Sequence, residues 1–181
     1  MALAPIFLFV VTAQTPAQNS APSEYQLKAA FLYSFAKFVD WPPGSFASPQ
    51  SPFAICILGL DPFGTAIDDT LRGKSIGEHP VTIERAKEPV EARHCQIIFV
   101  SSSEKLRLGE ILMALQGANV LVVGESDRFA DSGGTIQLML EQNHIRLAIN
   151  TDAAEGSGLR ISSKLLALAK IVHTEADPGK N

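Results

Sequence analysis

Two glycine-containing segments have part of the pattern of a phosphate-binding loop. Gly59 and Gly64 are separated by four residues after an apolar run, but Thr65 and Ala66 follow where this loop requires Lys and then Ser or Thr. The segment Gly73-Lys74-Ser75 supplies the lysine and the hydroxyl, but it has no glycine five positions before Gly73. Because each segment lacks an essential part of the motif, both are predicted to be turns.

Other catalytic patterns are also incomplete. Gly156-Ser157-Gly158 lacks the third glycine of a dinucleotide-binding motif, and the segment 124–128 lacks the closing glycine of a nucleophile elbow. The histidines stand singly, without the spacing of a metal site: His79, His94, His144 and His173. The sequence therefore predicts a binding or regulatory protein without catalytic residues, metal or cofactor. A hydrolase whose residues meet only on folding is an alternative.

One segment has the residue types of an anion-binding site. Arg160 stands at a predicted strand end, and Ser162, Ser163 and Lys164 follow at a predicted helix start. A cation, two hydroxyls and free backbone N–H groups at a helix N-terminus can bind an anion. The alternative is a capped helix in which Ser162 or Ser163 bonds its own backbone.

Aromatic side chains are concentrated in residues 24–41. Most of them are expected to lie in the core, but a helix that is apolar nearly all round must be buried on several sides, which can include a partner subunit. The residues of this segment predicted to contact a partner or ligand are Tyr33, Phe35, Lys37, Phe38 and Trp41.

The chain has two cysteines, Cys56 and Cys95. In an oxidising compartment such a pair most simply forms a disulfide, which would close a loop of about 40 residues and stabilise the fold by roughly 4 kcal/mol. The alternative is two free, buried thiols. The motif C-x-x-C is absent, so a thioredoxin-like redox role has no support.

The N-terminus predicts export. Residues 1–23 have no charged side chain, and the apolar run 6–11 is followed by small residues that fit a signal-peptidase site. Residues 1–17 are therefore predicted to be a signal peptide, with an end between 13 and 21; a buried N-terminal strand is the alternative. Hydrophobic residues make up 46% of the 181 residues, and this N-terminal segment contributes to that fraction.

Charge and length exclude two further classes of protein. The net charge of −4 argues against binding of nucleic acid through its phosphates. The longest apolar run is far shorter than the roughly 20 residues of a membrane-spanning helix, so direct membrane insertion is not expected.

Strands and helices alternate along the rest of the chain. Helices are predicted at 24–41, from Asp61 as N-cap to about 71, at 104–116, and from Ser162 or Ser163 to 172; strands at 52–58, 81–85, 95–100 and 119–123; and a hairpin at 135–140 and 145–149. This order predicts a single α/β domain at 24–173. We expect a mainly parallel sheet flanked by helices on both faces, with an antiparallel hairpin near the C-terminus.

Several blocks, in this order, resemble the YfiR family of exported bacterial proteins. They are KAAFLYSFAKFVDWP (28–42), CILG (56–59), GKSI (73–76), HCQIIFVSSSE (94–104), VLVVGES and FADSGG within 120–134, IRLAIN (145–150) and LRISSKLLALAKIV (159–172). The similarity runs from about residue 24 to 172.

The resemblance implies a periplasmic, commonly dimeric protein that represses an inner-membrane diguanylate cyclase by binding its periplasmic domain. It would thereby lower cyclic di-GMP and biofilm formation, and an outer-membrane lipoprotein would sequester the repressor. Cys56 and Cys95 match one disulfide of the family, whereas Ala130 and Gln137 stand near the place of a second bridge. The alternative function is a periplasmic small-ligand or nucleotide-binding protein that regulates another membrane sensor, such as a histidine kinase.

Overall fold

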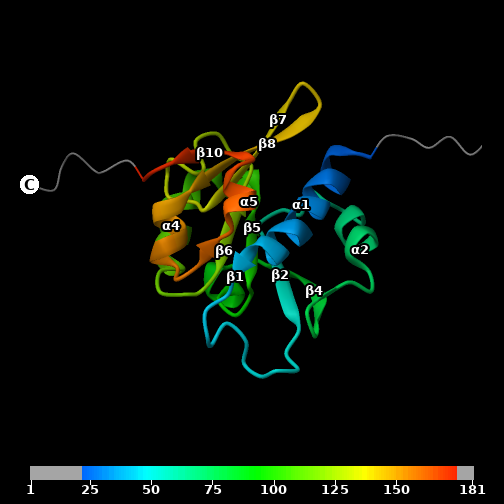
Figure 1. The fold of residues 1–181 in the computed structure, drawn as a ribbon. Helices are drawn as coiled ribbons and strands as arrows, with labels where there is room; N and C mark the ends of the chain where they lie inside the picture. Colours follow the sequence, from blue (N-terminus) through cyan, green and yellow to red (C-terminus); the bar gives the residue numbers. More distant parts are fainter. Residues whose placement is uncertain (1–21, 175–181) are drawn as a thin grey trace, which may run out of the picture.

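An eight-stranded sheet forms the centre of the protein. The structure is a computed structural model that describes residues 22–174 (Figure 1). Along the sheet the order is β10-β8-β7-β6-β5-β2-β4-β3, and the neighbours from β4 to β7 are parallel. The strands are β2 (Phe53–Leu58), β3 (Ser75–Ile76), β4 (His79–Ala86), β5 (Ile97–Val100), β6 (Leu121–Gly124), β7 (Ile136–Glu141), β8 (His144–Asn150) and β10 (Ala169–Val172).

Helices cover both faces of this sheet. Alternate residues of the fully buried β2 divide between two cores, with Ile55 and Ile57 in one and Cys56 and Leu58 in the other. The first core is covered by α1 (Glu24–Phe38), α2 (Ala66–Leu71) and α5 (Ser163–Leu166), and the second by α3 (Leu108–Ala114). The predicted fold class is thus confirmed.

The predicted hairpin is also confirmed. Strands β7 and β8 are antiparallel, with Glu141 opposite His144, and their tip extends away from the body of the molecule (Figure 1). The two loop residues Gln142 and Asn143 have φ values of 47° and 63°. Positive φ at both central positions gives a turn that matches the twist of the two strands.

The first helix ends earlier than predicted. It begins with a capping box in which Ser23 accepts a hydrogen bond from the Gln26 backbone, and it ends at Phe38 rather than residue 41. The chain instead forms β1 (Val39–Asp40), which pairs antiparallel with β9 (Arg160–Ile161). Backbone pairing with a distant segment therefore replaces the last turn of the predicted helix.

The predicted C-terminal helix to residue 172 is wrong in its length. The helix α5 has a single turn, and β10 follows it and pairs in parallel with β8, Ile171 lying opposite Ile149. Because β8 would otherwise be an open sheet edge, its unpaired backbone groups favour a strand here over the local helix pattern. The apolar residues of this segment fit either structure.

Two other predicted helices differ in their starts. Asp61 does not cap α2, which begins at Ala66; its carboxylate accepts from the Phe63 backbone in a turn at 2.7 Å. The segment 104–116 divides into a 3-10 helix, η2 (Ser102–Arg107), and α3. The remaining elements, α4 (Thr151–Gly156) and the 3-10 helix η1 (Pro89–Ala92), were not predicted.

Candidate functional site

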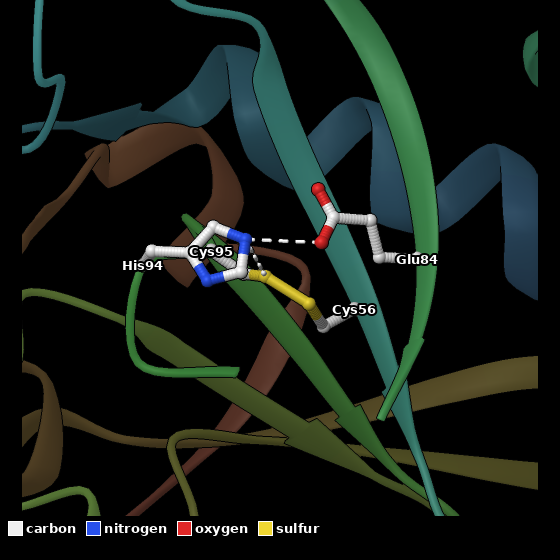
Figure 2. A group of neighbouring side chains, drawn as sticks. All are labelled: Cys56, Glu84, His94 and Cys95. Carbon is white, nitrogen blue, oxygen red and sulfur yellow. Dashed lines mark hydrogen bonds and ion pairs between the residues drawn. A yellow bond between two sulfur atoms is a disulfide. The ribbon is translucent and has the colours of Figure 1, made fainter. Parts of the chain in front are cut away.

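The two cysteines form the predicted disulfide. Cys56 lies in β2, Cys95 lies just before β5, and their Cα atoms are 6.0 Å apart. Both side chains are buried in the second core. Next to the bridge, His94 Nε2 and Glu84 Oε2 are within hydrogen-bonding distance, 3.0 Å apart (Figure 2).

The structure brings the two predicted binding segments together. Asp40 lies opposite Arg160 in the β1–β9 pair, and the Ser162 N–H donates to the Phe38 carbonyl at 2.9 Å. We call five of the exposed residues in and next to this pair, which also contains the exposed Asp40, the β1–β9 surface: Lys37, Phe38, Arg160, Ser163 and Lys164. The side chain of Phe38 is large and apolar, and the residue is 39% exposed. Three cations therefore lie in or next to these paired segments, and the exposed Asp40 adds a carboxylate opposite Arg160.

Three of the other predicted binding residues have structural roles. Phe35 is fully buried in the first core, so a partner has no access to it in this conformation. Trp41 packs edge-on against Phe53 with ring centroids 5.2 Å apart. The hydroxyl of Tyr33 donates to the Ser75 carbonyl at 3.1 Å, which ties α1 to β3.

The predicted anion site has little free hydrogen-bonding capacity. The Ser162 hydroxyl accepts from the Leu165 N–H at 3.4 Å, and α5 has only four residues. The structure thus uses Ser162 as an N-cap, as the alternative interpretation proposed. Arg160 and Lys164 are available at the surface instead.

A buried ion pair lies in a cavity that the sequence did not indicate. The Lys28 ammonium is 2.5 Å from Glu125 Oε2, and it also pairs with Glu24; the side chains of Lys28 and Glu125 are 4% and 8% exposed. Burial by itself lowers the pKa of Lys28, but hydrogen bonds to the two carboxylates outweigh burial and raise it. Burial and the nearby Glu125 raise the pKa of Tyr25, whose hydroxyl donates to Glu125 at 3.5 Å.

This cavity lies where α/β proteins bind ligands. It has a volume of about 670 Å³ and is lined by Glu125 directly after β6, by Ser102 after β5, and by residues of β7. Ligand sites of such folds lie at the carboxyl ends of the parallel strands, and their volumes are roughly 300–1,000 Å³. The sequence contains one feature that could have indicated a buried Lys28. This lysine precedes Leu32 and Phe35 by four and seven residues, so it lies on the buried side of α1 with them.

The family model of the YfiR/HmsC-like proteins matches residues 25–170. The chain belongs to this family. The match includes both cysteines, the β1–β9 surface and all the residues lining the cavity around Lys28 except Glu24 and Val172. Membership supports a periplasmic regulatory protein.

Solved structures with similar folds are larger than this chain. One is a conserved domain protein from Vibrio cholerae O1 biovar El Tor, with a TM-score of 0.56 and 12% identity. Another is an ABC domain in complex with L-Trp from Streptococcus pneumonia, with a TM-score of 0.52 and 10% identity. Each match covers 82% of this chain and 60% of the solved one, and at this identity it shows the fold alone.

The predicted signal peptide, residues 1–17, lies outside the described residues. Within 22–174, none of the helices combines the length and the apolar character needed to cross a bilayer.

Proposed function

We propose that this family member represses an inner-membrane diguanylate cyclase from the periplasm by binding the cyclase's periplasmic domain. Cyclic di-GMP, and with it biofilm formation, would then be lower when the protein is free to bind. Membership in the YfiR/HmsC-like family supports the regulatory role. The observation that carries the choice of surface is the β1–β9 pairing, in which the Phe38 carbonyl accepts from the Ser162 N–H, so the segment that ends α1 runs next to the segment that contains Arg160 and Lys164.

The chemistry of the β1–β9 surface fits a protein partner. Aromatic and arginine side chains dominate the binding energy of many protein interfaces, because they bury a large area with few rotatable bonds or form several hydrogen bonds. The cations Lys37, Arg160 and Lys164 would pair with carboxylates of the cyclase domain. Phe38 would supply the apolar contact at the centre.

Deletion of the gene tests the regulatory function directly. We expect cellular cyclic di-GMP to rise on deletion and to fall again on complementation with the wild-type gene. Crosslinking in the periplasm should capture the cyclase. Unchanged cyclic di-GMP together with no captured cyclase would refute the proposal.

Two variants test the surface. Phe38→Ala and Arg160→Glu should fail to restore low cyclic di-GMP and should reduce cyclase capture. Lys87→Glu, a charge reversal at another exposed position, should behave as wild type. If all three variants complement equally, the cyclase binds elsewhere.

Two further partners implied by the family resemblance belong to the same proposal. A homodimer is expected in solution, and light scattering after size-exclusion chromatography would measure its mass.

An outer-membrane lipoprotein is expected to compete with the cyclase for the repressor. Addition of the purified lipoprotein should then release the cyclase domain from immobilised protein.

A second candidate function is small-ligand binding in the cavity around Lys28, with regulation of a sensor such as a histidine kinase. The carboxylates there outnumber the cations: Glu24, Glu125, Asp127, Asp131 and Glu141 line it together with Lys28, Arg128 and Lys170. This balance favours a cationic or zwitterionic ligand over a nucleotide. A thermal-shift screen should therefore find amines or amino acids, and the shift should be lost in Glu125→Gln; stabilisation by nucleotides alone would contradict this.

A further inference from the structure

The disulfide lies within a group of four side chains whose donor atoms suit a metal ion. Glu84 lies directly opposite Cys56 in the β4–β2 register, so their side chains emerge on the same face of the sheet. His94 precedes Cys95, and its Nε2 is 3.6 Å from Cys95 Sγ and 3.0 Å from Glu84 Oε2 (Figure 2). The ligand atoms of all four residues lie within 4.8 Å of one another.

This spacing is close to that of a tetrahedral zinc site. Zinc–sulfur bonds of about 2.3 Å and zinc–nitrogen bonds of about 2.0 Å place neighbouring ligand atoms about 3.3–3.8 Å apart in a tetrahedron. The four atoms can reach such positions by side-chain rotation once the sulfur–sulfur bond is broken. Two thiolates, an imidazole and a carboxylate are all zinc ligands in proteins.

The backbone that carries these residues is held from several sides. Gln96 donates from its side chain to the Ser45 carbonyl at 2.5 Å and accepts from the Ala54 N–H at 2.8 Å. Arg93 donates to the carbonyls of Ala114, the last residue of α3, and Gln116, two residues beyond it. These contacts would keep Cys95 next to β2 when the disulfide is open.

Two of the four side chains are exposed to solvent. The side chains of His94 and Glu84 are 58% and 42% exposed. A cavity of about 220 Å³, lined by Gly44, Arg93, His94 and Cys95 among others, reaches the cysteine from the surface. A metal ion can therefore reach His94 and Glu84 from solvent, whereas Cys56 and Cys95 are each only 1% exposed, so a reductant reaches the disulfide only when the residues over it move aside.

We propose that reduction of the Cys56–Cys95 disulfide creates a zinc site formed by Cys56, Cys95, His94 and Glu84. A dithiol reductant transfers two electrons and two protons: its own thiols join in a disulfide, and Cys56 and Cys95 become thiols. Zinc then displaces one proton from each thiol to solvent, and His94 Nε2 and the Glu84 carboxylate complete the tetrahedron. In the reverse reaction a disulfide compound takes up two electrons from the thiolates and two protons from solvent and becomes a dithiol, while the Cys56–Cys95 bond re-forms; the ion is then released, because a disulfide has no thiolate to offer.

Cobalt is the probe for this site, since tetrahedral cobalt thiolates have strong absorption. The full chain is reduced by a phosphine, which leaves no competing thiol, and is titrated with Co²⁺ without oxygen. We expect thiolate-to-cobalt charge-transfer bands, intense visible bands of tetrahedral cobalt, and replacement of the cobalt by zinc with loss of colour. The oxidised protein should remain colourless.

Two ligand variants and a matched control complete the test. His94→Ala and Glu84→Gln are changes at exposed positions that preserve the cysteines. Each should weaken zinc binding at least roughly tenfold, because the loss of a group that only supports a metal ligand already lowers affinity by about that factor. His173→Ala removes a similar exposed histidine, whose Nδ1 lies 2.9 Å from Asp152 without a cysteine nearby, and should have no effect. The proposal is overturned if reduced protein shows no thiolate-to-cobalt bands, or if His94→Ala and His173→Ala bind zinc equally well.

Discussion

Lys28 and Glu125 are 97 residues apart in the chain, and their side chains meet in an almost fully buried ion pair at 2.5 Å. The pair joins α1 to the end of β6 at the wall of the cavity of about 670 Å³. Because both charges have lost most of their water, each depends on the other.

Removal of the lysine should therefore destabilise the protein strongly. In Lys28→Met the Glu125 carboxylate stays buried without its cation, and we expect a loss of about 3–5 kcal/mol in the free energy of unfolding. The double variant Lys28→Met/Glu125→Leu should recover most of this loss. Urea unfolding measures the stability of both variants. The control is Asp69→Ala, which breaks the exposed ion pair with Arg72 and should lower the free energy of unfolding by less than about 1 kcal/mol.

The same lysine predicts a loss of stability at alkaline pH. Its pKa is raised in the folded state, so its contribution is complete below the unfolded pKa of about 10.4 and is lost as pH rises through the folded pKa. The stability difference between wild type and Lys28→Met should be constant from neutral pH to about pH 10 and should shrink above it. A difference that shrinks at neutral pH would contradict the assignment. The pKa of Tyr25 is also raised in the folded protein, so ionisation of Tyr25 also lowers stability at alkaline pH. Tyr25→Phe removes this contribution and leaves that of Lys28.

Gly124 and Gly134 make room for the ring of Phe129. A Cβ added at either glycine would overlap this ring, which is buried and cannot move aside. Gly134→Ala should therefore destabilise the protein by about 1–3 kcal/mol, and Phe129→Leu in the same chain should reduce that penalty. Gly109→Ala is the control: it meets no atom within 4 Å and lies in α3, so it should be neutral or stabilising.

The disulfide should stabilise the oxidised protein by roughly 4 kcal/mol, by the entropy of closing a loop of this length. Urea unfolding with and without reductant measures this, with a chelator present so that a metal ion cannot compensate. In Cys56→Ala/Cys95→Ala the reductant should have no effect. Equal stability of oxidised and reduced wild type would show that the bridge does not constrain the unfolded chain.

Asn150 connects three segments and should tolerate substitution poorly. Its side chain accepts from the Ala153 N–H at 2.9 Å and donates to the Ala130 carbonyl at 2.7 Å and to Thr174 at 3.0 Å. Asn150→Ala removes an N-cap and leaves a buried carbonyl without its donor, so we expect a loss of about 1–3 kcal/mol. Ser162→Ala, which removes the N-cap of the short α5, should have a smaller effect. Thermal unfolding of the three proteins provides the comparison.

The sequence by itself was sufficient for the central strands and for the hairpin. Residues 53–58 and 97–100 are apolar at every position, and the strands that they form are buried on both faces. Such a run can be recognised from consecutive residues alone. The disulfide was also predictable, because the chain has only two cysteines. The burial of Phe35 agrees with the apolar helix predicted at 24–41, whereas Phe38 of the same helix is exposed and Lys28 is buried.

Only the tertiary structure decided the features that depend on distant partners. Residues 39–40 and 169–172 have patterns compatible with a helix, but they are strands because β9 and the edge of β8 offer unpaired backbone groups. The Lys28–Glu125 pair and the approach of Glu84 and His94 to the disulfide arise from sheet order and register. Periodicity reports which residues are buried, but it does not report which buried or edge groups meet, because that is determined by the packing of segments far apart in the chain.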